Sequence, residues 1–157
     1  YLKPDRLDLI AEGQPASTMI SPRTAQEYQL SENGADGDES PASVDMAGGT
    51  LAESDVLEAL GTGIYLGNLW YCNFSDRMNC RVTGMTRFAS FWVEHGKIAA
   101  PLNVMRFDDS LFRMLGENLE ALTTTPELIL DNHSYEARST SSARLPGALI
   151  RNFSLTL

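Results

Sequence analysis

A succession of aromatic and β-branched residues, interrupted by short polar turns, runs through residues 61–109. Side chains of these types pack well on a pleated sheet and favour strands over helices. Short polar or glycine-containing segments between such runs allow the chain to reverse, which predicts neighbouring antiparallel strands. The predicted strands are 64–74, 81–94 and 97–105, with turns at 75–79 and at His95-Gly96.

Apolar residues lie at both alternating positions of residues 87–94. Phe88 and Trp92 belong to one predicted face, and Val93 belongs to the other. Because successive side chains of a strand point to opposite faces, we expect both faces of this strand to be covered. The pattern therefore predicts a central strand with Trp92 in the core.

Capping signals mark two helix starts. Ser21 followed by Pro22 predicts a helix over 23–28, because serine caps the first turn and proline is tolerated in it. Residues 50–53, Thr-Leu-Ala-Glu, match a capping box, in which the Thr and Glu side chains accept hydrogen bonds from free backbone N–H groups. The helix that this box begins is expected to end at Gly61.

Leucine spacing predicts a third helix. Asp108 or Asp109 would cap it, and it would extend to Leu122. Residues 148–157 are predicted to form a closing strand. The order of elements predicts an α+β fold, a mostly antiparallel β-sheet with two or three helices packed on it. The leucines at helical spacing are Leu111, Leu115, Leu119 and Leu122.

The chain has 157 residues, of which 43% are hydrophobic, so that a single domain over 1–157 is expected to have its own core. Residues 31–49 are rich in Gly, Asp, Ser and Pro and are predicted to form an exposed acidic loop. The chain begins at Tyr1, and its first twenty residues contain no run of signal-peptide or membrane-span length. We therefore expect a piece of a larger cytoplasmic protein.

The formal net charge of -9 opposes binding to a phosphate backbone, so no nucleic-acid partner is expected, and no membrane partner either. Cys72 and Cys80 are the only cysteines, and their spacing fits no zinc or redox motif. We expect two free thiols in a reducing compartment. A disulfide across a hairpin stays open as the alternative.

No catalytic residue is predicted. The only histidines, His95 and His133, are too far apart to share one helical turn, as a zinc-binding pair requires. The acidic residues 33–40 lack the glycine and the last glutamate of a calcium loop. A dinucleotide fingerprint and a Gly-x-Ser-x-Gly nucleophile elbow are also missing. Four arginines surround the aromatic strands and could suit a peptide carboxylate, although scattered surface arginines are ordinary: Arg77, Arg81, Arg87 and Arg106.

One order of residues is distinctive: a Thr-Gly pair, then an aromatic strand ending in Glu, then a glycine turn and a proline. The residues are Thr83, Gly84, Phe91, Trp92, Val93, Glu94, Gly96, Ile98 and Pro101. This order resembles the C-terminal half of the TldD/PmbA family, whose members are often labelled candidate modulators of DNA gyrase. The resemblance extends more loosely from about residue 21 to the C-terminus.

The resemblance implies two subunits that form a dimer, enclose a proteolytic chamber and cut unstructured peptides. The catalytic subunit of the family carries His-Glu-x-x-x-His upstream of this region and takes a further metal ligand near its C-terminus. His133 lies in roughly that late segment and is the one candidate ligand, but the family's cysteine is absent there. That absence, and Met85-Thr86, place the chain closer to the PmbA subunit, which is TldE-like. Zinc is then expected only in the full-length protein or its partner.

By this resemblance the domain would shape the chamber wall and the dimer contact and would not perform the chemistry. Two other functions stay open. The chain could belong to a self-sufficient metallopeptidase whose His-Glu-x-x-x-His lies upstream, or it could be a peptide-binding module.

A surface that contacts a partner subunit or a peptide is predicted within residues 64–74, because this segment has more large side chains than one sheet face needs. Homodimers and heterodimers are both open. Strand alternation puts Tyr65, Leu69 and Tyr71 on one face and Trp70 and Phe74 on the other. At most one of these two sets is therefore expected to be exposed. The candidate contact residues are Tyr65, Leu69, Trp70, Tyr71 and Phe74.

Overall fold

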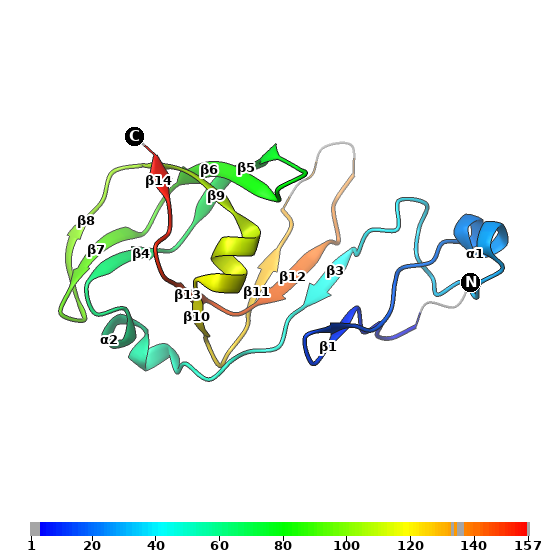
Figure 1. Cartoon of the computed structure of the whole chain (residues 1–157), viewed down its shortest axis with the longest axis horizontal. Coiled ribbons are helices and arrows are strands. Elements are labelled where there is room, and N and C mark those ends of the chain that lie inside the picture. Colours follow the sequence, from blue (N-terminus) through cyan, green and yellow to red (C-terminus); the bar gives the residue numbers. More distant parts are fainter. Residues whose placement is uncertain (1–3, 133, 135–136, 157) are drawn as a thin grey trace. The chain divides into compact units, whose positions relative to one another are not determined.

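The computed structural model describes residues 4–132, 134 and 137–156. The chain divides into two compact units (Figure 1). The first contains residues 1–44 and 129–143, and the second contains residues 45–128 and 144–157. The predicted α+β class is confirmed, since short helices accompany several small, mostly antiparallel sheets. None of the helices within the described ranges has the length and apolarity that a bilayer crossing requires.

Two sheets form most of the second unit. A four-stranded sheet has the order β14-β9-β6-β5, and a three-stranded sheet has the order β4-β7-β8. Each pair of neighbours in these sheets is antiparallel. The strands are β4 (Gly63–Leu66), β5 (Leu69–Asp76), β6 (Arg81–Thr86), β7 (Ser90–Glu94), β8 (Lys97–Pro101), β9 (Arg106–Ser110) and β14 (Leu155–Thr156).

The turn between β7 and β8 is the one predicted from the sequence. His95 has φ 50° and Gly96 has φ 73°, so two consecutive residues adopt the left-handed conformation that tight hairpins require. The His95 N–H donates to the Thr62 hydroxyl at 3.3 Å, and the Gly96 N–H donates to the Gly61 carbonyl at 2.7 Å. The hairpin tip is therefore tied to the segment that leads into β4.

Two of the predicted strands are each divided into two. Residues 64–74 divide between β4 and β5, and residues 81–94 divide between β6 and β7, so the prediction of continuous strands was wrong. The Gly67 N–H donates to the Ala89 carbonyl at 3.0 Å, and Ala89 has φ 48°. Both strands therefore break at the same level, where the chain passes from one sheet to the other.

The core of the second unit is small. Val93 and Thr86 are fully buried, and Phe107 is 1% exposed. Trp92 is only half-buried, and its indole N–H donates to Glu94 Oε1 at 2.7 Å. The prediction that Trp92 lies in the core was therefore wrong, because β7 buries the Val93 side more completely. The predicted central position of this strand is confirmed, since β7 lies between β4 and β8.

Gly84 and Phe107 pair directly across β6 and β9. A Cβ added at Gly84 would lie 2.7 Å from Phe107 Cε1, so the ring occupies the space over the glycine. Thr83 beside it donates its hydroxyl to the Phe107 carbonyl at 2.9 Å. The Thr-Gly pair therefore has a packing role: it seats one buried aromatic ring on the neighbouring strand.

The predicted helix from Asp108 or Asp109 to Leu122 was wrong at both ends, and only its middle part, residues 111–117, is helical. The two aspartates belong to β9, Leu111 and Phe112 are α-helical, and a π-helical turn (Arg113–Glu117) continues the helix. The chain then extends as β10 (Leu119–Leu122), which pairs with β13 (Ala148–Ile150). Pairing with a distant apolar strand overrides the leucine periodicity here.

Helix α2 (Val56–Leu60) ends where predicted, with Gly61 at its C-cap, and a 3-10 turn (Glu53–Asp55) precedes it. The predicted capping box is absent, because neither described N-cap makes a side-chain cap bond. Glu53 instead accepts the Thr125 N–H at 2.7 Å and the Thr124 hydroxyl at 2.9 Å. The bond from the Thr125 backbone is the main reason that the pKa of the Glu53 carboxyl is lowered.

Segments far apart in sequence meet at residues 122–125, which we call the threonine junction. Thr123 is 9% exposed and accepts the Gly49 N–H at 2.8 Å. Its own N–H donates to the Gly147 carbonyl at 2.9 Å, and the Gly147 N–H donates to the Thr123 hydroxyl at 2.8 Å. An isolated bridge joins Leu51 to Thr123. The junction therefore holds three segments of the second unit together.

In the first unit the predicted helix is confirmed as α1 (Pro22–Tyr28), and the Ser21 hydroxyl accepts the Thr24 N–H. Glu39 accepts the Ser21 N–H at 2.8 Å, which ties the acidic segment to the start of the helix. Most of residues 31–49 are exposed, and a short strand lies among them. Besides β10 and β13, the strands outside the two main sheets are β1 (Ile10–Ala11), β2 (Gln14–Pro15), β3 (Ser43–Asp45), β11 (Glu127–Leu130) and β12 (Ser142–Leu145).

Candidate functional site

The five candidate contact residues, which we call the aromatic set, are all exposed. The least exposed is Tyr65 at 37%, and the most exposed is Tyr71 at 78%. The expectation that only one of the two faces would be exposed was therefore wrong. Tyr65 lies on β4, and the other four lie on β5, which is an edge strand of its sheet. The remaining members are Leu69, Trp70 and Phe74, at 42%, 49% and 49%.

A bulge in β5 explains why alternation failed. The pairing of β5 with β6 shifts between Trp70 and Asn73, and Tyr71 between them has φ 57°. A bulge places extra residues opposite the partner strand and turns side chains away from their regular faces. Large side chains on both sides of this edge strand therefore remain in solvent.

Arg87 contacts both a ring of the aromatic set and the exposed ring of Phe88. Its guanidinium carbon lies 4.5 Å from the ring centre of Trp70 and 4.7 Å from that of Phe88. Arg77 lies over Phe74 at a longer distance, 5.7 Å. These distances are within the range in which a cation is attracted to the face of an aromatic ring.

The four arginines that sequence reasoning grouped together have different environments. Arg81 forms an ion pair with Asp108, whose carboxylate accepts the Arg81 Nε–H at 2.9 Å. Arg77 and Arg87 stack on rings instead. The involvement of Phe88 was missed, because the predicted continuous strand placed this side chain, which is 70% exposed, in a covered sheet.

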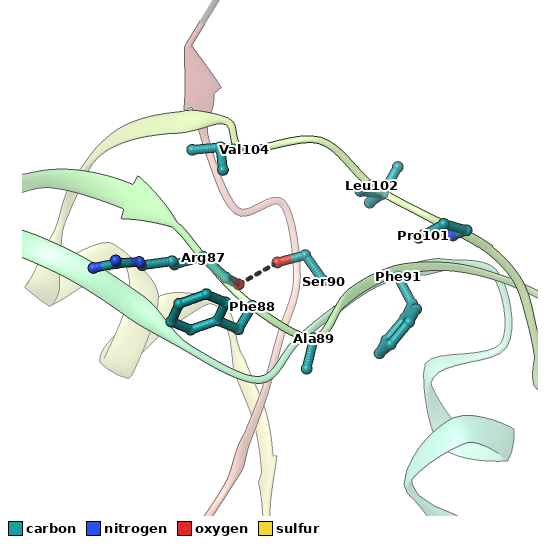
Figure 2. Close-up of a pocket in the computed structure, with 8 residues that line it drawn as sticks. All are labelled: Arg87, Phe88, Ala89, Ser90, Phe91, Pro101, Leu102 and Val104. Carbon is teal, nitrogen blue, oxygen red and sulfur yellow. Dashed lines mark hydrogen bonds between the residues drawn. The ribbon is translucent and has the colours of Figure 1, made fainter.

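A small pocket of about 130 Å³ adjoins Arg87 (Figure 2). The Ser90 hydroxyl donates to the Arg87 carbonyl at 2.9 Å, which closes the turn that carries the pocket. In Figure 2 the Arg87 guanidinium lies at one end of the drawn residues, and Phe91 and Pro101 lie at the other. The lining is mostly apolar: Arg87, Phe88, Ala89, Ser90, Phe91, Pro101, Leu102 and Val104.

The other candidate metal ligands that the structure describes do not lie together. Among the residues that the structure describes, no three His, Cys, Asp or Glu side chains form a group that could hold a metal ion. His95 lies in the β7–β8 turn, and His133 lies outside the described residues, so that its candidacy as a ligand stays a prediction. Cys72 and Cys80 are both free thiols, as expected.

The one buried carboxylate of β9 is structural. Asp109 is 2% exposed and accepts the Arg113 Nε–H at 2.8 Å, the Ser110 N–H at 2.8 Å and the Ser154 N–H at 3.0 Å. Burial raises the pKa of Asp109, but the hydrogen bonds from Arg113 and the two N–H groups outweigh it and lower the pKa overall. Asp109 is therefore ionised at neutral pH and ties Ser154 to β9.

Comparison with known proteins identifies related sequences and folds. Over residues 2–157 the chain matches the family described as PmbA/TldA metallopeptidase C-terminal domain. TldE from Thermococcus kodakarensis has a similar fold, with a TM-score of 0.73 and 14% identity over 95% of this chain. A protein from Thermotoga maritima described as a candidate modulator of a DNA gyrase also has a similar fold. Its TM-score is 0.68, and its sequence is 12% identical over 94% of this chain. No protein in the curated set matches the chain.

The matches cover only part of the solved proteins. This chain accounts for 33% of the TldE chain and 32% of the Thermotoga maritima chain. It therefore spans about a third of the length of the structures that it resembles.

Proposed function

Because the chain belongs to the PmbA/TldA metallopeptidase family, as its C-terminal domain, we propose that it forms part of a proteolytic chamber and a dimer contact and is not itself catalytic. Its partner would be a second PmbA/TldD-type subunit, identical or different. Zinc would be held by the upstream part of the full-length protein or by the partner. Unstructured peptides would be the substrates of the assembly.

The observation that carries this proposal is the exposure of the aromatic set. Tyr71 is 78% exposed, and the other four members are each more than a third exposed. Buried interface cores are enriched in tyrosine, tryptophan and phenylalanine. A group of large apolar side chains on an edge strand and its neighbour also creates a risk of aggregation unless another chain covers it. We therefore assign the dimer contact to β4 and β5.

Sedimentation of the chain, alone and mixed with a metal-binding subunit of the PmbA/TldD type, tests the contact. We expect a dimer in one of the two samples. Replacing Tyr71 and Phe74 together by serine should weaken that dimer at least about tenfold, because interface aromatics often contribute more than 1 kcal/mol each. Replacing Phe112 by serine is the matched control, since Phe112 is 68% exposed but belongs to the helical turn after β9.

Two outcomes would contradict the assignment. One is a chain that stays monomeric in both samples at high concentration. The other is a dimer that resists the double replacement at Tyr71 and Phe74 but dissociates in the Phe112 control. A His-Glu-x-x-x-His sequence upstream in the same polypeptide, with peptidase activity of the isolated protein, would favour a self-sufficient metallopeptidase instead.

A further inference from the structure

We infer that Arg87, which contacts the rings of Trp70 and Phe88, binds the C-terminal carboxylate of a peptide, and that the adjoining pocket receives the apolar side chain of the peptide's last residue. This inference deepens the proposed function, because it assigns a ligand to the edge of the aromatic set. Its geometry comes from residues of this chain alone, and Trp70 is the one residue that it shares with the proposed dimer contact.

The guanidinium of Arg87 lies close to two aromatic rings. The ring centre of Trp70 lies 4.5 Å from the Arg87 guanidinium carbon, and that of Phe88 lies 4.7 Å from it. A guanidinium is planar and directs its N–H groups outward within that plane, so rings stacked on it leave the donors free. Two of these donors match the two oxygens of a carboxylate in a bidentate pair.

The structure gives the Arg87 guanidinium no carboxylate partner within its described residues. Five other arginines do form ion pairs in that part of the chain, each with an aspartate or a glutamate. A half-buried cation without an acid partner stands out in a chain of net charge -9. An anionic group from outside the chain would satisfy it.

Backbone hydrogen bonds fix the position of Arg87 before any ligand arrives. The Arg87 N–H donates to the Asn68 carbonyl at 3.0 Å, and the Gly67 N–H donates to the Ala89 carbonyl at 3.0 Å. On the other side of the turn, the Leu102 N–H donates to the Ser90 carbonyl at 2.8 Å. A site that is already ordered loses little conformational freedom on binding, which favours even a small ligand.

The pocket beside Arg87 limits what the ligand can be. Its volume of about 130 Å³ is well below the roughly 300–1,000 Å³ of sites for cofactors and drug-sized molecules. The lining by Phe91, Pro101, Leu102 and Val104 suits one aliphatic side chain. A peptide that ends in an apolar residue carries a carboxylate and such a side chain on the same carbon atom, and Arg87 itself belongs to the lining of the pocket.

Other anions fit this site less well. Binding to the phosphate backbone of a nucleic acid requires clustered cations. The described residues of this acidic chain supply only Arg87 at the site, and Arg77 lies over a different ring, that of Phe74. Free phosphate has no group for the apolar lining to contact. The combination of one fixed cation with a small apolar pocket therefore favours a chain-terminal carboxylate.

Titration of the chain with N-acetyl-Ala-Ala-Leu, followed through the Trp70 indole resonance by NMR, tests the inference. We expect saturable binding that weakens as salt is added, since the pair is partly exposed to solvent. The same peptide with a C-terminal amide should bind at least about tenfold more weakly, because it lacks the charge that the guanidinium pairs with. N-acetyl-Ala-Ala-Ala should also bind more weakly, because it leaves the pocket empty.

Two replacements at Arg87 separate charge from geometry. Arg87→Gln should weaken binding of the free acid at least about tenfold and leave binding of the amide unchanged. Arg87→Lys keeps the charge and should still lose several-fold, because an ammonium group cannot form the bidentate pair. Arg23→Gln, at an exposed arginine of α1, is the control for net charge and should bind normally. An unchanged Trp92 resonance in each variant would show that the fold is intact.

Some results would overturn the inference. These are equal binding of the free acid and the amide, equal loss in the Arg87→Gln and Arg23→Gln variants, or a peptide amide with an internal glutamate that binds as tightly as the free acid. Failure of the dimer experiment with Tyr71 and Phe74 would not affect this test, because peptide binding is measured on the chain alone.

Discussion

Replacing Gly84 by alanine tests the packing that joins β6 to β9. The new Cβ would lie 2.7 Å from Phe107 Cε1, 2.8 Å from Phe107 Cζ and 3.1 Å from the Trp70 carbonyl oxygen. Carbon atoms rarely approach so closely, so the ring or the strand has to move. The Phe107 ring is 1% exposed and contacts the Phe153 ring at 5.2 Å between centres, so it has little free space to enter.

The expected cost follows from this overlap. Adding one methyl group to a well-packed site costs about 1–3 kcal/mol. Replacing glycine in a strand by alanine also returns roughly 0.5–1 kcal/mol, because the unfolded chain loses freedom. We therefore expect Gly84→Ala to lower the free energy of unfolding by about 1–2 kcal/mol. Phe107→Leu removes the ring atoms that the methyl group would meet, so in that background the added cost of Gly84→Ala should largely vanish.

Urea unfolding of the wild type, the two single variants and the double variant measures this coupling through tryptophan fluorescence. The double variant should be more stable than the sum of the single effects allows, by about 1 kcal/mol. Additive effects, or a Gly84→Ala variant as stable as the wild type, would refute the reasoning. The Thr-Gly pair would then need another explanation.

Three further predictions concern other parts of the second unit and the candidate metal ligand. Asp109→Asn should lower the free energy of unfolding at neutral pH by about 2–3 kcal/mol, less than the roughly 3–5 kcal/mol of a fully buried pair, because Arg113 is still about a third exposed. Because the pKa of Asp109 is lowered in the folded chain, the stability that this carboxylate contributes should be complete above about pH 4 and disappear as the pH falls further. The acid unfolding curves of the wild type and the variant should therefore converge. Parallel curves would contradict this. Trp92→Ala should cost about 1–2 kcal/mol in thermal unfolding, less than the about 3–5 kcal/mol of a fully buried aromatic, since the indole is half-buried; a larger loss would mean that the core extends to it. After dialysis the chain should retain no zinc, because its two histidines lack helical spacing; stoichiometric zinc that is lost in His133→Ala would show the opposite.

Local signals in the sequence predicted the parts of the fold that depend on neighbouring residues. Ser21 and Pro22 predicted the start of α1, and Gly61 predicted the end of α2. The His95-Gly96 turn was also evident, because few residue pairs adopt positive φ at both positions. In each of these cases the residues that decide the conformation lie within one turn of each other.

Pairing between segments far apart in the chain could not be predicted from the sequence. Leu119 and Leu122 fit a helix as well as a strand, and only the distant partner β13 decides in favour of a strand. Glu53 fits a capping box, yet Thr124 and Thr125 compete for its carboxylate from far along the chain. Local pattern cannot weigh such partners, since their effect depends on which segments meet in space.

The same limit applied to the candidate site. The residues of the aromatic set could be named because large apolar side chains were unusually dense in residues 64–74. Their common exposure could not be predicted, because it depends on the bulge at Tyr71. The stack of Arg87 on Phe88 was also unpredictable, since it requires the chain to leave β6 before residue 88.

The threonine junction has a consequence for how quickly the second unit can fold. Its bonds join residues very distant in sequence, as in the pair of Glu53 and Thr124, which are 71 residues apart. Long loops must close before such contacts stabilise anything, so we expect refolding in milliseconds to seconds rather than microseconds. During that time the apolar side chains of β5 and β10 are open to other molecules. Refolding yield should therefore fall steeply with protein concentration, even where the finished domain is stable.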